Sequence, residues 1–104
     1  MSQFDVYENT NQDSKNTYPY FVAIQNSLLD SLNTRLVIPL TPSRYLSESI
    51  TKLCPATTID SESFFLLTQQ MTNVPLSALQ EPKGSLAHLQ DEIIAAVDFL
   101  VTGI

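Results

Sequence analysis

The final segment of this 104-residue chain constrains its fold more than any other feature. Apolar side chains recur there at the spacing of an α-helix, which places them along one stripe. The stripe contains Leu86, Leu89, Ile93, Ala96, Val97 and Leu100, and it is widened by Ile94 and Val101. Ser85 is a suitable N-cap, and neither proline nor glycine interrupts the segment before Gly103. We therefore predict one amphipathic helix that begins at Leu86 and packs its apolar stripe against the rest of the chain.

The residues before this helix predict short β-strands rather than further helices. Segments with alternating or continuous apolar residues are 3–7, 18–25, 35–40, 57–60, 64–70 and 72–75. Residues 60–63 predict a hairpin turn, and the ten polar residues 8–17 predict a mobile loop that contributes nothing to the core. Several short strands followed by one helix favour a small, strongly bent antiparallel sheet or barrel with the helix packed on it. The expected fold class is α+β and mainly β.

Length and charge limit the organisation and the partners of the chain. A length of 104 residues predicts a single domain over residues 1–104 with one small core, to which dimerisation would add buried area. The net charge is −6, from 11 acidic residues against five scattered basic ones. Nucleic-acid binding needs a basic stripe that displaces counterions from phosphates, so we expect no direct DNA or RNA binding. An acidic surface instead suits a protein partner with basic patches.

The sequence predicts a cytoplasmic protein without a membrane segment. The N-terminal residues lack the basic and apolar regions of a signal peptide. The longest strongly apolar stretch, residues 93–101, is too short to span a bilayer and contains Asp98. Cys54 is the only cysteine, so an intrachain disulfide is impossible and a reducing compartment is expected.

Catalytic and metal-binding motifs are missing from the sequence. His88 and Cys54 are the only histidine and cysteine, and they lie far apart in the chain without zinc or EF-hand spacing. Residue types for a Ser–His–Asp or Cys–His arrangement are present, but no nucleophile motif accompanies them. With only Gly84 and Gly103, a glycine-rich phosphate loop is absent as well. We expect no metal, no cofactor and no catalytic residue, and hence not an enzyme.

The side of the predicted helix opposite the apolar stripe is the strongest candidate for a binding surface. His88, Asp91, Ala95, Asp98 and Thr102 fall on that side at 100° per residue. An ordinary solvent-exposed face is the alternative reading of this pattern. The end of the chain favours binding, because Gly103 and Ile104 follow the helix directly and chain ends are usually polar. Asp91 and Ala95 are predicted as a possible additional partner face.

Several short motifs along the chain together resemble one protein family. They are Gln3-Phe4 with Val6-Tyr7, Phe21-Val22 with Gln25 before Leu28-Leu29-Asp30, Arg35-Leu36-Val37-Ile38-Pro39-Leu40, Leu53 with Pro55, Met71 with Val74-Pro75, and the final Gly103-Ile104. In this order and spacing, the chain resembles the CcdB family, the toxin half of bacterial toxin–antitoxin pairs. The resemblance covers nearly the whole sequence.

The resemblance implies a structure and a function. It implies a homodimer of a small SH3-like antiparallel barrel with a C-terminal helix. Members of the family poison DNA gyrase by binding its A subunit and trapping the cleaved gyrase–DNA complex, without a cofactor and without catalysing a reaction. A CcdA-like antitoxin neutralises them with a disordered segment that folds on binding. The loop at residues 8–17 looks longer than in the best-known member and lies near the family's antitoxin surface.

The family's gyrase contacts are carried over by position onto six residues. They are Leu28, Leu29, Asp98, Thr102, Gly103 and Ile104. The best-known member of the family has tryptophan at the position of Thr102 and asparagine at that of Asp98. Tryptophan can stack on an arginine, which threonine cannot do, whereas Asp98 can form a charge-assisted hydrogen bond worth about 1.5–3 kcal/mol. Gyrase poisoning is expected to be retained, with a different affinity or host range.

Two other functions remain open at this stage. One is an endoribonuclease of the Kid and MazF type, because such toxins share the barrel and fold does not fix function. Two arginines and one histidine in an acidic chain equip it poorly for RNA cleavage. The other is a degenerate paralogue that binds the antitoxin but no longer poisons gyrase, for which Thr102 and Asp98 are the support.

Overall fold

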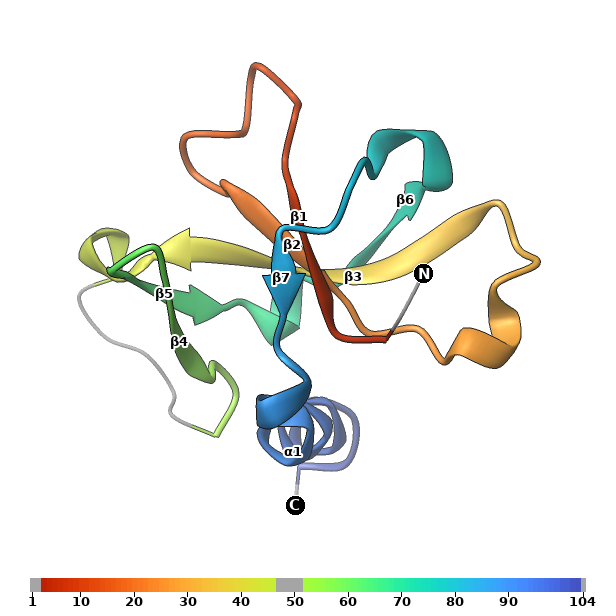
Figure 1. The fold of residues 1–104 in the computed structure, drawn as a ribbon. Helices are drawn as coiled ribbons and strands as arrows, with labels where there is room; N and C mark the ends of the chain where they lie inside the picture. Colours follow the sequence, from red (N-terminus) through yellow and green to blue (C-terminus); the bar gives the residue numbers. More distant parts are fainter. Residues whose placement is uncertain (1–2, 47–51, 104) are drawn as a thin grey trace.

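The computed structural model of the protein describes residues 3–46 and 52–103. Its main element is an antiparallel sheet of short strands that curls into a half-barrel, with one helix beneath it (Figure 1). The strands are β1 (Asp5–Glu8), β2 (Tyr20–Ala23), β3 (Thr34–Pro42), β4 (Ala56–Ile59), β5 (Glu62–Leu66), β6 (Thr72–Pro75) and β7 (Gly84–Ser85), and the helix is α1 (Gln90–Thr102). The predicted fold class, mainly β with a C-terminal helix, is confirmed.

Strand β3 forms the centre of the sheet because it pairs along both edges. One edge runs antiparallel to β2, and the other is divided between β6 and β5. The pairing with β6 ends at Val37, and the pairing with β5 begins at Leu40. Pro39 lacks a backbone N–H, and it lies where the strand changes partner. A proline is thus tolerated in a central strand, and the divided edge allows the sheet to bend around β3.

Both faces of the curled sheet carry buried apolar side chains. The larger cluster contains Phe4, Val6, Val22, Ile38, Leu40, Phe64, Leu66, Leu86 and Ile93. The smaller cluster contains Tyr7, Ala23, Val37 and Leu79. Neighbours in a strand point to opposite faces, so Val6 and Tyr7 belong to different clusters. Helix α1 supplies Ile93 to the larger cluster, and this contact fixes the helix against the sheet.

Strand β1 begins two residues later than the pattern predicts because Phe4 adopts a left-handed conformation, with φ of 69°. This conformation is uncommon outside glycine. Here the surroundings enforce it. The Phe4 N–H donates to Ala23 O at 2.6 Å, its carbonyl accepts from Leu86 N–H at 2.8 Å, and its ring is buried in the larger cluster. Phe4 therefore ties the start of the sheet to the segment that leads into α1.

The hairpin between β4 and β5 is tighter than the predicted four-residue turn. Asp60 and Ser61 alone form it, with φ of 51° and 67°, as a two-residue turn with positive φ at both positions. The predicted strand over 64–70 is also wrong beyond Leu66. Residues Thr68–Gln70 form a 3₁₀ turn instead, with Thr68 fully buried, and this turn contacts α1.

The final helix begins four residues later than predicted. β7 pairs with β1, and Leu86 N–H is held by Phe4 O, so the chain stays attached to the sheet up to this point. Ser85 is not the N-cap of this segment, because Leu86 precedes the 3₁₀ turn Ala87–Leu89 and Leu89 precedes α1, both without a side-chain cap. Ser85 Oγ accepts from Ala87 N–H at 3.1 Å instead. The α-helix follows from Gln90.

The loop between β1 and β2 is more ordered by hydrogen bonds than its polar sequence predicts. Asn9 is buried, and its amide Nδ2 donates to Ser14 Oγ at 2.9 Å and to Tyr18 O at 2.8 Å. Asn9 Oδ1 also accepts from Asn11 N–H at 3.0 Å. The expectation that this loop contributes nothing to the interior is wrong, because the buried Asn9 holds the loop in place through hydrogen bonds.

Candidate partner-binding site

The end of α1 brings three of the predicted contact residues together on the surface. Asp98 and Thr102 lie one helical turn apart, and both are exposed. The Thr102 hydroxyl donates to Asp98 O at 2.7 Å, so this side chain is bound back onto its own helix. Gly103 ends the helix with φ of 75°, and its N–H donates to Phe99 O at 2.8 Å. We call residues 98–103 the helix end; Ile104, also predicted, lies outside the described residues.

Exposed apolar side chains surround this helix end. Ile94, Leu100 and Val101 are 44%, 39% and 74% exposed, although the sequence places all three in the buried stripe. The expectation is wrong for them because the sheet covers only one side of the helix, where Ile93 and Ala96 are buried. Exposed apolar patches are typical of protein-binding sites.

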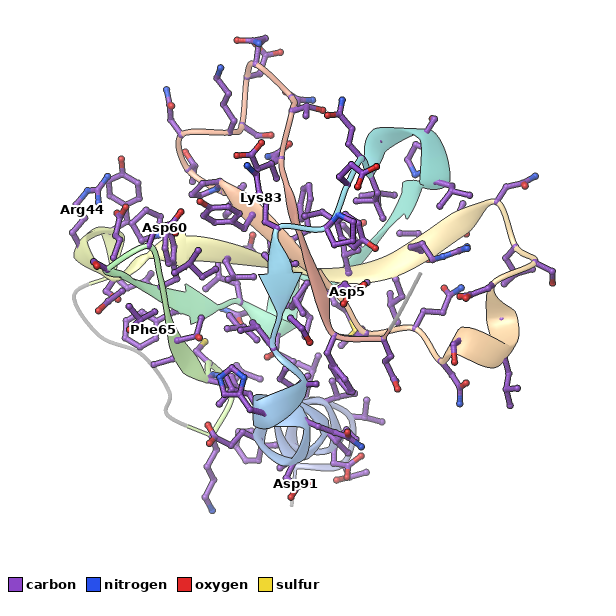
Figure 2. All side chains as sticks on the ribbon, in the orientation of Figure 1. Asp5, Arg44, Asp60, Phe65, Lys83 and Asp91 are labelled. Carbon is purple, nitrogen blue, oxygen red and sulfur yellow. The ribbon has the colours of Figure 1, made fainter. Side chains whose placement is uncertain are left out.

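The two residues predicted as an additional partner face lie on the same helix. Asp91 and Ala95 are exposed, and their spacing from Asp98 and Thr102 puts the four residues along one side of α1. Figure 2 shows Asp91 on the side of α1 that faces away from the sheet. His88, predicted on the same face, is exposed in the 3₁₀ turn that precedes α1. These positions agree with a solvent face as well as with a partner face.

Leu28 and Leu29 lie in a different part of the molecule, in the connection between β2 and β3. They belong to a 3₁₀ helix, η1 (Ser27–Leu29), whose three residues are all exposed. Leu28 is 88% exposed, and Leu29 and Leu32 are 49% exposed each. We call residues 26–33 the leucine loop. Sequence reasoning missed Leu32, although its spacing of four residues from Leu28 within a polar segment is a usable signal.

The leucine loop and the helix end do not form one continuous surface in a single chain. Figure 1 shows η1, drawn in orange, to one side of α1 and apart from it. A groove of about 200 Å³ lies between them, next to α1 and the base of the leucine loop. Its lining includes Ile24 and Leu36 from the loop's base and Ile94, Val97 and Asp98 from the helix. The groove therefore borders the helix group of predicted contacts through Asp98, whereas Leu28 and Leu29 do not line it.

Charged side chains are paired elsewhere on the surface. Lys83 Nζ lies 3.4 Å from Glu8 Oε1, and Arg44 forms an ion pair with Glu62 and packs over the Tyr45 ring. Figure 2 places Arg44 near the β4–β5 hairpin, far from Asp91 on α1. These two basic side chains are therefore paired away from α1, whereas α1 itself carries Asp91, Glu92 and Asp98.

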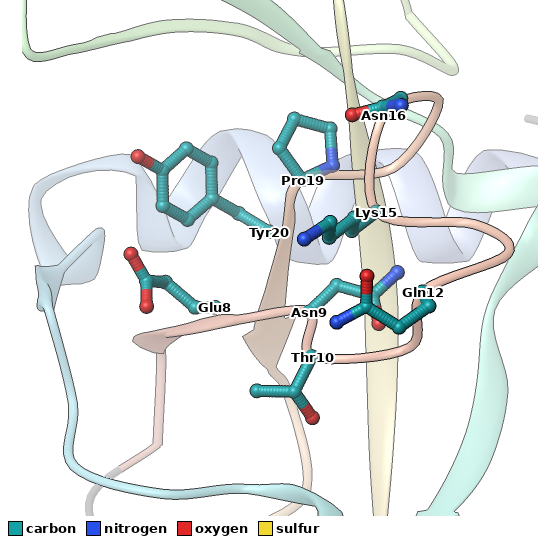
Figure 3. Close-up of a pocket in the computed structure, with 8 residues that line it drawn as sticks. All are labelled: Glu8, Asn9, Thr10, Gln12, Lys15, Asn16, Pro19 and Tyr20. Atoms are coloured by element: carbon teal, nitrogen blue, oxygen red, sulfur yellow. The ribbon is translucent and has the colours of Figure 1, made fainter.

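A polar pocket lies beside the loop between β1 and β2, which Figure 1 shows at the end of the molecule opposite α1. Figure 3 shows the residues that line it. Its volume is about 380 Å³. The lining consists of Glu8, Asn9, Thr10, Gln12, Lys15, Asn16, Pro19 and Tyr20. Burial and the negative charges of Asp60 and Glu8 raise the pKa of Tyr20, so its phenol stays protonated at neutral pH. The pocket thus offers amide and hydroxyl groups for hydrogen bonding.

The described part of the chain contains neither a metal-binding cluster nor a membrane-spanning helix. Within residues 3–46 and 52–103, no group of three histidine, cysteine, aspartate or glutamate side chains is arranged to hold a metal ion. Cys54 is buried, with Sγ 3.5 Å from Gln69 Oε1. Among these same residues, no helix has the length and apolarity that crossing a bilayer requires.

Comparison with known protein families identifies the family of the chain. The sequence model of the CcdB protein family matches residues 3–103. The chain belongs to the CcdB family. Its curled antiparallel sheet and closing helix agree with the expectation drawn from the sequence motifs, and the predicted family is confirmed. Membership of the CcdB family indicates a toxin of a toxin–antitoxin system.

Proposed function

We propose that this CcdB-family protein binds the A subunit of DNA gyrase and traps the cleaved gyrase–DNA complex. The match to the CcdB family over residues 3–103 carries this proposal. The exposed apolar side chains at the helix end and in the leucine loop support it, because each would lose water contact on binding a protein. In this proposal, Asp98, Thr102, Gly103 and Ile104 contact gyrase from the helix, and Leu28 and Leu29 from the loop.

A gyrase cleavage assay tests the proposal directly. Purified protein is incubated with gyrase, supercoiled DNA and ATP, and the cleaved complexes are counted after denaturation with detergent. We expect cleaved DNA with the full chain and with the control Ile104→Val, and none after deletion of residues 103–104. Full activity of the deletion variant would contradict the assigned site, and inactive full-length protein would contradict gyrase poisoning.

The partners proposed with this function are a second copy of the chain and an antitoxin. Homodimerisation would add buried area to a chain of only 104 residues. Sedimentation measurements over a range of concentrations would show a dimer. The antitoxin would bind through a partly disordered segment carrying basic residues, since the toxin has a net charge of −6. The loop over the polar pocket would make this pairing specific to the system.

One observation favours the alternative of an antitoxin-binding paralogue without gyrase activity. Thr102 replaces the tryptophan of the best-known family member, and its hydroxyl is already bound to Asp98 O. Expression in a gyrase-sensitive bacterium separates the two functions. Growth arrest that is relieved by the antitoxin supports poisoning, whereas normal growth together with antitoxin binding supports the paralogue. Cleavage of added RNA would instead identify an endoribonuclease.

A further inference from the structure

The exposed side chains of the leucine loop do not stabilise its conformation. Leu28 is 88% exposed, so its position gains little from burial within the chain. A short polar connection with exposed leucines would ordinarily sample many conformations, which lowers binding affinity through the entropy lost on ordering. Something other than apolar packing must hold this loop.

Polar side chains at both ends of the loop supply that support. Asn26 caps η1 by accepting from Leu28 N–H at 2.9 Å. Gln25 Nε2 donates to Leu29 O at 3.2 Å and to Thr34 O at 3.3 Å, and its Oε1 accepts from Leu36 N–H at 3.1 Å. These bonds join the ends of the loop to β3. They do not involve the carbonyls of Asp30 and Leu32, which accept from another donor.

That donor is Arg35, the first buried residue of β3. The residue is only 4% exposed, which is unusual for an arginine and unfavourable unless the charge is paired. The guanidinium donates to Leu32 O at 2.6 Å, to Thr34 O at 2.9 Å and to Asp30 O at 2.8 Å. Its Nε also lies 3.8 Å from Asp30 Oδ1. The planar fork of arginine directs donors from three nitrogen atoms at fixed angles, whereas the three donors of a lysine share one nitrogen.

We propose that Arg35 is a positioning residue, whose buried guanidinium holds residues 26–33 in the conformation that presents Leu28 to gyrase. The inference rests on the proposed function for the identity of the partner, but not for the effect of Arg35 on the loop. Arg35 lies under the loop, with its guanidinium directed at the loop's carbonyls. Arg35 acts on binding through Leu28. It raises the affinity because the loop is already ordered before the partner binds.

Two substitutions test this role. Arg35→Met keeps the length of the side chain and removes every donor, and Arg35→Lys keeps the charge without the fork. Amide hydrogen exchange at Leu29, Asp30 and Leu32 measures the order of the loop in the free protein. We expect exchange there to accelerate by about tenfold or more in Arg35→Met and less in Arg35→Lys. If Arg35→Met fails to fold, the comparison is made with Arg35→Lys alone.

Binding to the gyrase A subunit provides the second measurement. We expect Arg35→Met to weaken binding by about tenfold, and most of this loss to disappear in the background of Leu28→Ala. The control is Ile59→Ala, in the remote strand β4. Its affinity is compared with that of Arg35→Met at equal distance below the melting temperature of each variant, and we expect it to bind normally. Unchanged loop exchange, or a loss of affinity that is the same with and without Leu28, would overturn the role of Arg35. Wild-type protein that does not bind gyrase would overturn the proposed function, while the exchange measurement would still decide whether Arg35 orders the loop.

Discussion

The leucine loop and the helix end both expose apolar side chains, but they are held by different forces. The leucine loop has exposed residues throughout η1, and its conformation depends on hydrogen bonds from Gln25, Asn26 and Arg35. The helix end continues a helix whose earlier turns are anchored in the core through Ile93 and Ala96. One surface is therefore maintained by polar side chains, and the other by hydrophobic burial and regular backbone hydrogen bonds.

This difference affects how each surface responds to mutation. Removing a core contact under α1 lowers the stability of the whole protein, because the larger cluster joins the helix to the sheet. Removing a hydrogen bond of the leucine loop acts mainly on the loop, since its leucines take little part in the core. The loop can therefore change its binding properties with small effects on folding, whereas the helix end is linked to global stability.

The largest effect is expected from Ile93→Ala. Ile93 is 1% exposed, and truncating a buried isoleucine to alanine lowers the free energy of unfolding by about 2–5 kcal/mol. The neighbouring Ile94→Ala is the matched control, and we expect it to lower the same quantity by less than about 1 kcal/mol. Urea unfolding followed by circular dichroism measures both. Equal losses would show that α1 is not anchored on one side as described.

The next effect is expected at the leucine loop, in binding rather than in stability. Leu28→Ala should leave the free energy of unfolding within about 0.5 kcal/mol of the wild type, because the side chain is almost fully exposed. It should weaken binding to the gyrase A subunit by about tenfold, or 1.4 kcal/mol. Calorimetric titration gives the affinity, and Tyr45→Ala, an exposed residue far from α1, serves as the control. Weakening by Tyr45→Ala to the same extent would remove the leucine loop from the binding site.

A smaller effect is expected at the end of α1. Gly103 has φ of 75°, and a Cβ added there would meet open space, so only the backbone conformation opposes a side chain. Gly103→Ala should therefore lower stability by about 1 kcal/mol. Gly84→Ala is the natural control, because Gly84 also faces open space and lacks a positive φ. Thermal unfolding of the two variants should separate them, and identical melting temperatures would contradict the conformational explanation.

The smallest effect concerns alkaline pH and the buried phenol of Tyr7 in β1. The pKa of Tyr7 is raised from its ordinary value of 10.0, first by burial and then by the charge of Asp5, with Arg35 opposing the shift and Asp30 adding to it. A raised pKa favours the protonated phenol in the folded protein. The stability from Tyr7 is thus fully present below pH 10 and is lost as pH rises through the folded-state pKa.

Tyr7→Phe should reduce the fall in melting temperature between pH 9 and pH 11. The remaining dependence should come in part from Tyr20, whose pKa is raised in the same direction. Melting curves collected across this pH range for wild type, Tyr7→Phe and Tyr20→Phe provide the test. An unchanged alkaline slope in both variants would show that neither phenol contributes to stability in this way.

Much of the fold followed from local patterns in the sequence. The helical stripe after Ser85 predicted α1, and the continuous apolar run from Arg35 to Leu40 predicted the buried part of β3. Each pattern repeats within a few residues and reports directly on which side of an element is buried. The resemblance to the CcdB family likewise depended on short motifs and their order, and it was confirmed.

The details of the site depended on contacts between segments that are distant in sequence. Ile94 and Val101 share the helical period of Ile93, and only the width of the sheet decides that they remain exposed. Phe4 delays the start of β1 because Ala23 and Leu86 both bind its backbone. The spacing of residues along the chain contains no information about either effect.

The sequence by itself determined the fold class, the closing helix and the family, because periodicity and motif order are local properties. Tertiary structure alone decided that β3 divides one edge between β5 and β6, and that the guanidinium of Arg35 is buried beneath the leucine loop. An arginine at the start of a strand is expected to be exposed. Its burial here follows from the carbonyl oxygens of residues 30–34, which converge only when the loop folds back over β3.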